Sequence, residues 1–238
     1  MKKHYRQKEG IEDLHQAASD AIDWSQFLNP SVNYEEGGVL LIDKPLHWTS
    51  FDVVRKIRGL LKIKKVGHAG TLDPLASGLL IVCTGKFTKK INEYMAKEKE
   101  YTGTITLGAV TSTYDLESLP EQHKDISALT ETNIRNAVGL FQGELMQKPP
   151  IYSAIKKKGT PLYELARRGE EVEIEPRKIF IQSFEITHFR LPEIDFKVVC
   201  STGTYIRSLA HDLGQALHCG GYLSKLRRTA IGEFRVQD

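Results

Sequence analysis

Alternation of apolar and polar residues across positions 170–200 constrains the fold of this 238-residue chain more than any other feature. The runs "EVEIE", "KIFIQSFEI" and "FKVVCS" follow one another in that stretch. A period of two is typical of strands that bury one face. Strands and helices do not alternate along the chain as regular βαβ units, so the sequence predicts an α+β fold with a largely antiparallel sheet.

Further strands and three helices are expected. The strands are "GGVLLIDKP", the apolar run at 78–85 and "EYTGTITLG". The helices are "TSFDVVRKIRGLLK", which Thr49 or Ser50 can cap, "TETNIRNAVGLF" and "TYIRSLAHDLGQAL". The residues expected to face the core are Val53, Val54, Ile57, Leu60 and Leu61 in the first helix, and Ile206, Leu209, Ala210, Leu213 and Leu217 in the last.

The first 36 residues differ from the rest of the chain. Positions 9–36 carry seven acidic residues and no Lys or Arg. Apolar residues recur at helical spacing at Ile11, Leu14, Ala18 and Ile22, which predicts a short amphipathic helix that has ended by "NP". We expect 1–36 to form an N-terminal appendage on a main domain at 37–238.

Composition and charge point to a globular protein with a polyanionic partner. The chain is 40% hydrophobic and 26% charged, as is usual for such proteins. The net charge is only +3, but 53–66 holds six basic residues and no acid. Basic stretches beside glycine-rich loops favour phosphate contacts.

The cysteines and the apolar runs indicate the cellular compartment in which the protein works. Cys83, Cys200 and Cys219 form no C-x-x-C pair, which predicts reduced, buried thiols. The sequence holds no apolar run of about 18 residues and no signal-peptide core after its basic start. We expect a cytoplasmic protein that is a monomer and needs no obligate protein partner.

Three motifs fail on inspection. "CTGKFT" lacks a phosphate-binding P-loop pattern, because Leu80 and Phe87 stand where Gly and Ser or Thr are needed. Ser153 to Lys156 matches an S-x-x-K of acyl-enzyme hydrolases without the partner motifs S-D-N and K-T-G. No H-E-x-x-H or H-x-E with P-C-x-x-C is present, so no catalytic zinc is expected.

A lone carboxylate stands in the glycine-rich stretch "VGHAGTLDPLASGLLIVCTGK" at 66–86. Gly67, Gly70 and Gly78 permit tight turns and a close approach by another molecule. Pro74 biases Asp73 toward an extended conformation. The loop follows the most basic stretch of the chain and precedes a buried strand. An isolated aspartate more often caps a turn, but this context favours a presented, functional carboxylate.

Two other stretches also carry residues that suit a functional site. "CSTGTYIRSLAHDLG" places Tyr205 and Arg207 in the first turn of a helix, and Arg207 and His211 four residues apart on its polar face. "QKPPIYSAIKKKGTPLYELARRG" mixes prolines, tyrosines and cations, which suit stacked bases and phosphates. Either stretch alone is also compatible with a surface loop and an ordinary amphipathic helix.

Taken together, these blocks resemble one family, the TruB-type tRNA pseudouridine-55 synthases, over roughly 37–235. The landmarks occur in the family's order: "LIDKP", "TSFDVV", "GHAGTLDPLASGLL", "KEYTGTITLG", "PPIYSAIKKKGTPLYELARRG", "CSTGTYIRSLAHDLG" and "LRRTAIG". The resemblance implies the pseudouridine synthase fold, with a mixed, mostly antiparallel central sheet flanked by helices. It implies conversion of uridine 55 in the T-arm of tRNA to pseudouridine, with no metal or organic cofactor.

The resemblance also assigns roles to residues. Asp73 matches the catalytic aspartate, Arg207 the arginine that pairs with it, and Tyr101 the tyrosine that stacks on the flipped base. Burial raises the pKa of a carboxyl and a nearby guanidinium opposes this, which suits a nucleophile that must stay ionised. Lining the uracil pocket are Tyr205 and Leu226. His68 helps to hold the flipped-out RNA loop, and Lys44 and Pro45 match a structural element near the cleft.

An insertion at about 146–178 is expected to close over the tRNA arm. Its cations would meet phosphates, which position RNA rather than read its sequence; they are Lys156, Lys157, Lys158, Arg167 and Arg168. Two departures from the family stand out. This chain stops at "GEFRVQD" where members commonly continue into a small C-terminal RNA-binding domain, and His47 stands where the family often has glycine.

Two alternatives remain open from the sequence. One is a non-catalytic tRNA-binding or folding factor on the same scaffold. The other is a related uridine isomerase that partner proteins guide to another RNA. The presence of Asp73, Tyr101 and Arg207 favours the enzyme, and the absence of the extra domain after "GEFRVQD" favours the stand-alone tRNA type.

Overall fold

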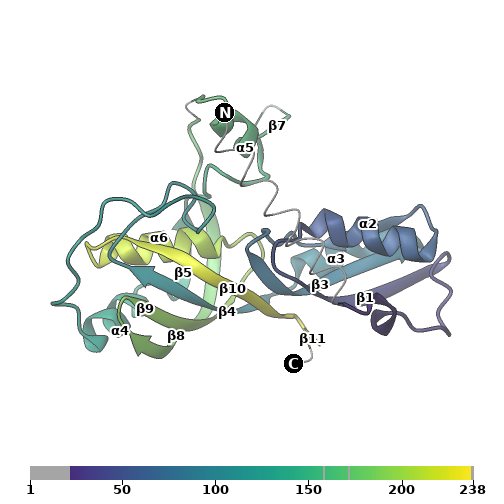
Figure 1. Cartoon of the computed structure of the whole chain (residues 1–238), viewed down its shortest axis with the longest axis horizontal. Helices are drawn as coiled ribbons and strands as arrows, with labels where there is room; N and C mark the ends of the chain where they lie inside the picture. The colour runs from purple at the N-terminus through teal and green to yellow at the C-terminus, as the bar shows by residue number, and fades with distance from the viewer. Residues whose placement is uncertain (1–21, 158, 171, 237–238) are drawn as a thin grey trace. The chain divides into compact units, whose positions relative to one another are not determined.

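A computed structural model describes residues 22–157, 159–170 and 172–236 and divides them into two compact units (Figure 1). The first unit contains 22–99 and 227–236, and the second contains 100–226. Strand β10 therefore contributes its first half to the second unit and its second half to the first. The helix expected from Ile11, Leu14 and Ala18 lies outside the described residues.

The first unit is built around strand β3. Strands β1 and β10 flank β3, β2 also pairs with β3, and β11 pairs with β10. Strand β1 pairs with β3, β2 with β3 and β10 with β11, each in antiparallel register. The elements are η1 (Trp24–Phe27), β1 (Gly37–Lys44), α2 (Ser50–Leu61), β2 (Val66–Ala69), β3 (Ala76–Gly85), η2 (Lys86–Lys90), α3 (Ile91–Ala96), the end of β10 (Gly221–Ile231) and β11 (Phe234–Arg235).

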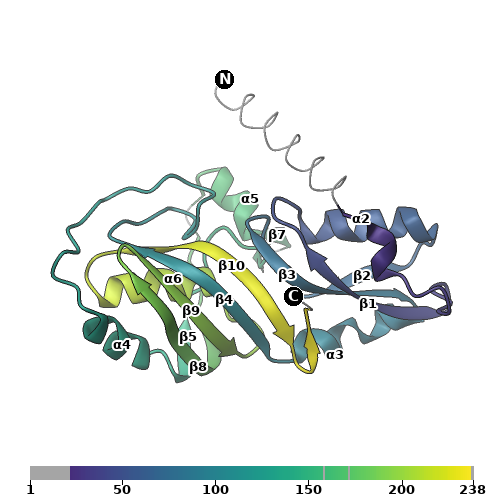
Figure 2. The same cartoon turned by 60° about the horizontal axis from the view of Figure 1, so that its bottom comes forward.

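Strand β3 is buried on both faces, which explains its unbroken apolar sequence. Alternate residues enter two separate cores. Leu80 and Val82 pack in a cluster with α2, while Leu79, Ile81 and Cys83 pack in a second cluster with α3. Figure 2 shows α2 and α3 on opposite sides of these strands. The buried strand expected at 78–85 is confirmed, with two more residues at its start.

Helix α2 begins with a reciprocal cap. Thr49 Oγ1 accepts from the N–H of Asp52 at 3.0 Å, and Asp52 Oδ2 accepts from the N–H of Thr49 at 3.0 Å. This capping box satisfies two backbone donors that no helical carbonyl can reach. Of the predicted inward face, Val53, Val54 and Ile57 are buried. The prediction for Leu60 was wrong: it lies in the last turn, beyond these residues, and is 45% exposed.

The described part of the expected appendage packs into the first unit. Trp24 is buried and stacks on Trp48, with ring centroids 4.9 Å apart. Tyr34 is also buried, and its hydroxyl oxygen accepts from the N–H of Asn29 at 2.7 Å. Since Trp24, Trp48 and Tyr34 belong to the same cluster as Leu40, this segment supplies core side chains to the unit.

The second unit is a sheet with helices, in the strand order β10–β4–β9–β8–β5. Strand β8 pairs with β5 and with β9 in antiparallel register, and an isolated bridge between Asp115 and Leu223 is parallel. The predicted α+β fold with a mixed, mostly antiparallel sheet is confirmed. The elements are β4 (Lys99–Leu107), α4 (Glu131–Gly139), β5 (Gly143–Gln147), β6 (Lys156–Lys157), β7 (Thr160–Pro161), α5 (Leu162–Arg167), β8 (Arg177–Arg190), β9 (Glu193–Cys200), α6 (Ile206–Ala216) and the start of β10.

Two details of this unit differ from expectation. Residues 172–175 of "EVEIE" form no strand, although Val172 and Ile174 are half-buried and Glu173 and Glu175 are exposed. Pro176 separates them from β8 and has no N–H to donate to a ladder. In α6, Ile206, Leu209, Ala210 and Leu213 are buried as predicted, whereas Leu217 is only partly buried.

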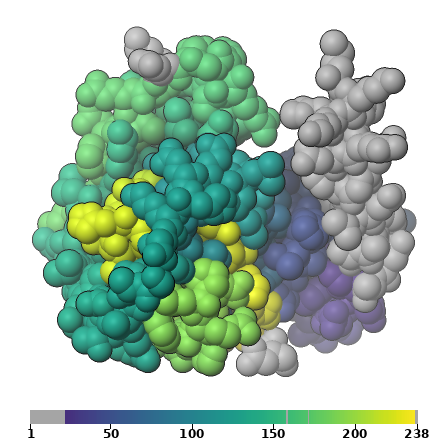
Figure 3. All heavy atoms as spheres, turned by 60° about the vertical axis from the view of Figure 1, so that its left-hand side comes forward, coloured from purple at the N-terminus to yellow at the C-terminus, as the bar shows by residue number. Residues whose placement is uncertain are grey.

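A long loop at 108–130 connects β4 to α4 and is fixed to the C-terminal part of the second unit. Gly108 donates its N–H to the carbonyl of Gly220 at 3.2 Å, and Leu223 donates to the carbonyl of Tyr114 at 2.9 Å. Figure 3 shows this loop in teal beside the yellow segments. The loop is therefore held by backbone hydrogen bonds, although it contains no helix and no named strand of its own.

Candidate active site

The glycine-rich loop of the first unit connects β2 to β3 and carries Asp73, which is half-buried. The carbonyl of Asp73 accepts from the N–H of Ala76 at 3.0 Å, which closes the turn into β3. Gly70 and Gly78 have φ of 87° and 102°, a region that favours glycine. A Cβ at Gly78 would lie 2.3 Å from the carbonyl oxygen of Arg228, so only glycine fits there.

Two buried cations lie in the neighbourhood of this loop. Arg228 is 1% exposed; its Nε donates to the carbonyl of Leu79 at 2.8 Å and its Nη2 to the carbonyl of Gly70 at 2.9 Å. Lys44 is fully buried and its Nζ donates to the carbonyls of Pro45 at 2.9 Å and Trp48 at 2.6 Å. Arg228 thus fixes the loop at Gly70 through a charge-assisted hydrogen bond, while Lys44 fixes the segment that follows β1.

These cations influence each other and the carboxylate. Burial lowers the pKa of Lys44 to about 8; the negative charge of Asp73 opposes that shift, and the positive charge of Arg228 adds to it. Lys44 and Asp73 are therefore electrostatically coupled. The structural role expected for Lys44 and Pro45 stays a prediction, and the hydrogen bond between them is consistent with it.

His68 lies on β2, two residues before Gly70. Burial lowers the pKa of its imidazole, and the charge of Arg228 lowers it further. The ring is therefore neutral near pH 7. Its Nδ1 is buried and has no hydrogen-bond partner among the described residues. A neutral, half-buried ring with an unused nitrogen is compatible with an RNA contact, the role that the sequence predicts for His68.

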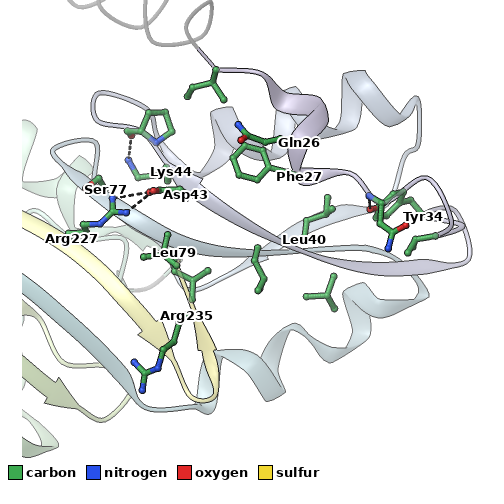
Figure 4. A pocket seen from close by; sticks show the side chains of 17 residues that line it. Gln26, Phe27, Tyr34, Leu40, Asp43, Lys44, Ser77, Leu79, Arg227 and Arg235 are labelled. Carbon is green, nitrogen blue, oxygen red and sulfur yellow. Dashed lines mark hydrogen bonds and ion pairs between the residues drawn. The ribbon is translucent and has the colours of Figure 1, made fainter. Parts of the chain in front are cut away.

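A groove of about 920 Å³ also lies on the first unit (Figure 4). At one end Asp43 accepts two hydrogen bonds from Arg227, at 3.0 and 2.7 Å, and Lys44 lies beside this pair. Neither Asp73 nor His68 lines the groove. It is therefore a separate feature from the loop that carries the candidate nucleophile, although Lys44 borders it.

The other predicted residues lie in the second unit, on α6, β4 and β10. Tyr205 is the N-cap residue of α6. The side-chain amide of Gln147, at the end of β5, accepts from the N–H of Tyr205 at 2.8 Å and donates to its carbonyl at 3.0 Å. Since Gln147 is only 4% exposed, this pairing fixes the backbone of Tyr205. Tyr101 lies on β4 and is buried, and Leu226 lies on β10 and is half-buried.

Arg207 is buried in a polar network. Its Nη1 donates to the carbonyl of Thr113 at 3.1 Å, its Nη2 to that of Tyr152 at 2.9 Å, and its Nε lies 3.5 Å from Asp115 Oδ2. The expectation that Arg207 and His211 share a polar face was wrong. Arg207 is 5% exposed because its guanidinium has these internal partners, and the His211 ring stacks on Tyr114 at 3.9 Å.

The predicted phosphate-binding cations lie in and after the β6–β7 hairpin. Lys156 and Lys157 are exposed, and Lys157 donates to the carbonyl of Glu173 at 2.8 Å. Arg167 lies over the ring of Tyr163, 5.5 Å from its centroid. Arg168 is exposed and pairs with Glu164 at 3.5 Å and Glu170 at 3.6 Å, while Lys158 lies outside the described residues.

Sequence reasoning missed Arg228, Asp115 and Gln147. For Arg228 a signal existed: two adjacent arginines within the strand "LRRTAI" must point to opposite faces, so one of them is directed inward. Asp115 and Gln147 gave no comparable signal, because their partners are 92 and 58 residues away along the chain.

Two features are absent from the described residues, a metal-binding cluster and a membrane-spanning helix. Within 22–236, apart from the two gaps, no grouping of three or more His, Cys, Asp and Glu could hold a metal ion. Over the same residues, no helix has the length and apolarity needed to cross a membrane.

Known proteins resemble this chain over most of its length. The model of the TruB family pseudouridylate synthase N-terminal domain matches residues 58–206, and that of the tRNA pseudouridylate synthase B C-terminal domain matches residues 207–238. A protein named tRNA pseudouridine synthase B from Flavobacterium johnsoniae is 57% identical over 86% of this chain and 93% of its own length. One of the same name from Opitutus terrae is 51% identical over 86% of this chain and 85% of its own length.

A solved structure shares the fold. A chain of a Cbf5-Nop10-Gar1 complex is 31% identical, with a TM-score of 0.66 over 86% of this chain. This chain spans about half of that one, 51% of its length.

The chain therefore belongs to the TruB family of pseudouridylate synthases. The family, the enzyme class and the fold that the sequence predicts are confirmed.

Proposed function

We propose that this chain isomerises uridine 55 in the T-arm of tRNA to pseudouridine, with Asp73 as the nucleophile. The observation that carries the proposal is the position of Asp73, half-buried on a loop that buried Arg228 holds, within a chain 57% identical to a tRNA pseudouridine synthase B. Relatives of that name favour tRNA as the substrate; the chain of the Cbf5-Nop10-Gar1 complex is less similar, at 31% identity over 51% of its length.

The reaction conserves every atom of the nucleoside. The bond from uracil N1 to ribose C1′ breaks, the base turns, and a bond from C5 to C1′ forms. The C5 proton leaves to solvent and N1 takes up a proton. The proposal requires no oxidant, no metal and no organic cofactor.

Asp73 supplies the nucleophile to a nucleotide drawn out of its stack. Arg207 supplies a guanidinium at the start of α6. A positive charge near a carboxyl lowers the pKa of that carboxyl and so keeps it ionised. Tyr101 is proposed to stack on the flipped base, and Tyr205 and Leu226 to line the uracil pocket. His68, neutral and with Nδ1 unused, is proposed to help hold the flipped-out RNA loop.

The exposed cations of the second unit are proposed to contact phosphates. Lys156, Lys157 and Arg167 belong to the segment proposed to close over the tRNA arm. The Arg167–Tyr163 stack adds an aromatic surface beside a cation, which suits single-stranded RNA. Such contacts position the RNA and make affinity fall as salt rises.

The test of the uridine assignment uses a tRNA transcript labelled with tritium at C5 of every uridine. We expect release of tritium from this transcript and none from the matched transcript with cytidine at position 55. Continued release from the cytidine transcript would place the target at another uridine. A T-arm stem-loop alone tests whether the arm suffices.

A further inference from the structure

The residues on either side of Asp73 are hydrogen-bonded to one short segment of the first unit. The hydroxyl of Ser50 donates to the carbonyl of Leu72 at 3.1 Å, and Ser50 Oγ accepts from the N–H of Leu72 at 2.8 Å. The N–H of His47 donates to the carbonyl of Pro74 at 2.8 Å. The segment that leads into α2 therefore tethers the catalytic loop immediately before and immediately after Asp73.

The Ser50 tether is buried. Ser50 is 1% exposed and Leu72 3% exposed, so water cannot readily replace the hydroxyl. A single side chain satisfies both the donor and the acceptor of the Leu72 peptide groups, and buried backbone groups require such partners. Without the hydroxyl, the backbone at Leu72 must move to find other partners, and Asp73 would move with it.

Capping of helix α2 does not explain the two hydrogen bonds between Ser50 and Leu72. A serine at the start of a helix ordinarily caps it. Here Thr49 is the cap and pairs reciprocally with Asp52, so α2 does not use the hydroxyl of Ser50. Ser50, one residue inside the helix, directs its hydroxyl to a residue 22 positions further along the chain.

We propose that Ser50 is a positioning residue for the isomerisation: its two hydrogen bonds to Leu72 set the place of the Asp73 carboxylate. The inference rests on the proposed role of Asp73 as nucleophile. A displacement of about 1 Å at a reacting group costs on the order of 100-fold in rate. Pro74 restricts Asp73 to an extended conformation, so a shift at Leu72 passes directly to the carboxylate.

The principal variant is Ser50→Ala, and its matched control is Thr49→Ala. The control removes the cap of the same helix and lowers the melting temperature, but leaves both bonds to Leu72. For Ser50→Ala we expect kcat for tritium release to fall by about 10- to 100-fold, with KM for tRNA changed less than about threefold. For Thr49→Ala we expect kcat to stay close to that of the unaltered chain.

A second variant separates hydrogen bonding from packing. Ser50→Cys keeps nearly the same volume but offers only a weak donor and acceptor. We expect its kcat to follow that of Ser50→Ala. Recovery of kcat in Ser50→Cys would mean that volume rather than hydrogen bonding matters at this position, and would overturn the inference.

A readout independent of activity completes the test. Hydrogen exchange at the Leu72 amide should be at least about tenfold faster in Ser50→Ala than in Thr49→Ala. Equal exchange in the two variants, or an unchanged kcat in Ser50→Ala, contradicts the positioning role. If the unaltered chain binds tRNA and releases no tritium, the proposed function fails, while the exchange experiment still decides whether the tether exists.

Discussion

Lys44 offers the sharpest test of the electrostatics around Asp73. Its ammonium is fully buried, and burial lowers its pKa from the ordinary 10.5 to about 8. The perturbation is Lys44→Met, which keeps an unbranched side chain and removes the charge. At neutral pH the unaltered chain bears the cost of burying a cation that the variant does not have.

The magnitude follows from the difference between the two pKa values. Below pH 8 both the folded and the unfolded chain hold the proton, and the cost is fully present. Between pH 8 and 10.5 the unfolded chain binds more protons, so stability rises with pH. The shift from 10.5 to about 8 corresponds to roughly 3 kcal/mol.

Other groups titrate in the same range, so the comparison with the variant is essential. Burial raises the pKa of the Cys83 thiol from 9.0 to about 11, which makes stability fall as pH rises from 9 to 11. That contribution is common to both chains and cancels in their difference. The loss of hydrogen bonds to Pro45 and Trp48 in Lys44→Met is constant across the range and cancels in the slope.

The assay is urea unfolding at several pH values, followed by tryptophan fluorescence. The chain has two tryptophans, Trp24 and Trp48, and both lie in the first unit with Lys44. We expect the unfolding free energy of the unaltered chain, minus that of Lys44→Met, to rise by about 3 kcal/mol between pH 7 and 10.5. A flat difference would refute the reasoning. In Asp73→Asn the rise should begin at lower pH, because Asp73 raises the pKa of Lys44.

Three further predictions concern stability and RNA binding. Gly78→Ala should destabilise the first unit by more than about 2 kcal/mol in the same assay, since its Cβ would lie 2.3 Å from a backbone oxygen at positive φ; unchanged unfolding would contradict this. Asp115→Asn removes the carboxylate charge 3.5 Å from the buried guanidinium of Arg207 and should cost about 1.5 to 3 kcal/mol in urea unfolding followed by near-UV circular dichroism; a loss below about 0.5 kcal/mol would contradict the pairing. Lys156→Ala combined with Lys157→Ala should lower the log–log salt slope of tRNA affinity by about two, and an unchanged slope would remove both lysines from the interface.

Much of the fold could be predicted from local patterns. The caps and apolar spacing of α2, the unbroken apolar run of β3 and the alternation in β8 and β9 each follow from neighbouring residues. The exceptions are segments whose local pattern meets no neighbouring strand or core surface in the fold. "EVEIE" alternates, but residues 172–175 pair with no strand. Leu60 continues the apolar face of α2 into its last turn, where it is 45% exposed.

The candidate site was predictable only in part. Asp73 was singled out as the candidate nucleophile because its loop is punctuated by glycine and proline and has a family counterpart; its role stays a prediction. The residues that hold the site act across the fold: Ser50 bonds Leu72, Arg228 bonds Gly70, and Gln147 bonds Tyr205. Such pairs are set by tertiary packing, and no local spacing in one sequence reveals them. The positions of Tyr101 and Arg207 on their elements were predicted, but the burial of Arg207 was not.

The central claim is that Asp73 is the nucleophile of a tRNA uridine isomerase. The most direct measurement is tritium release from tRNA labelled at uridine C5, comparing the unaltered chain with Asp73→Asn, since isomerisation leaves the mass unchanged. The account predicts release by the unaltered chain, none by the variant, and similar tRNA affinity for both. Release by Asp73→Asn at a comparable rate would contradict it.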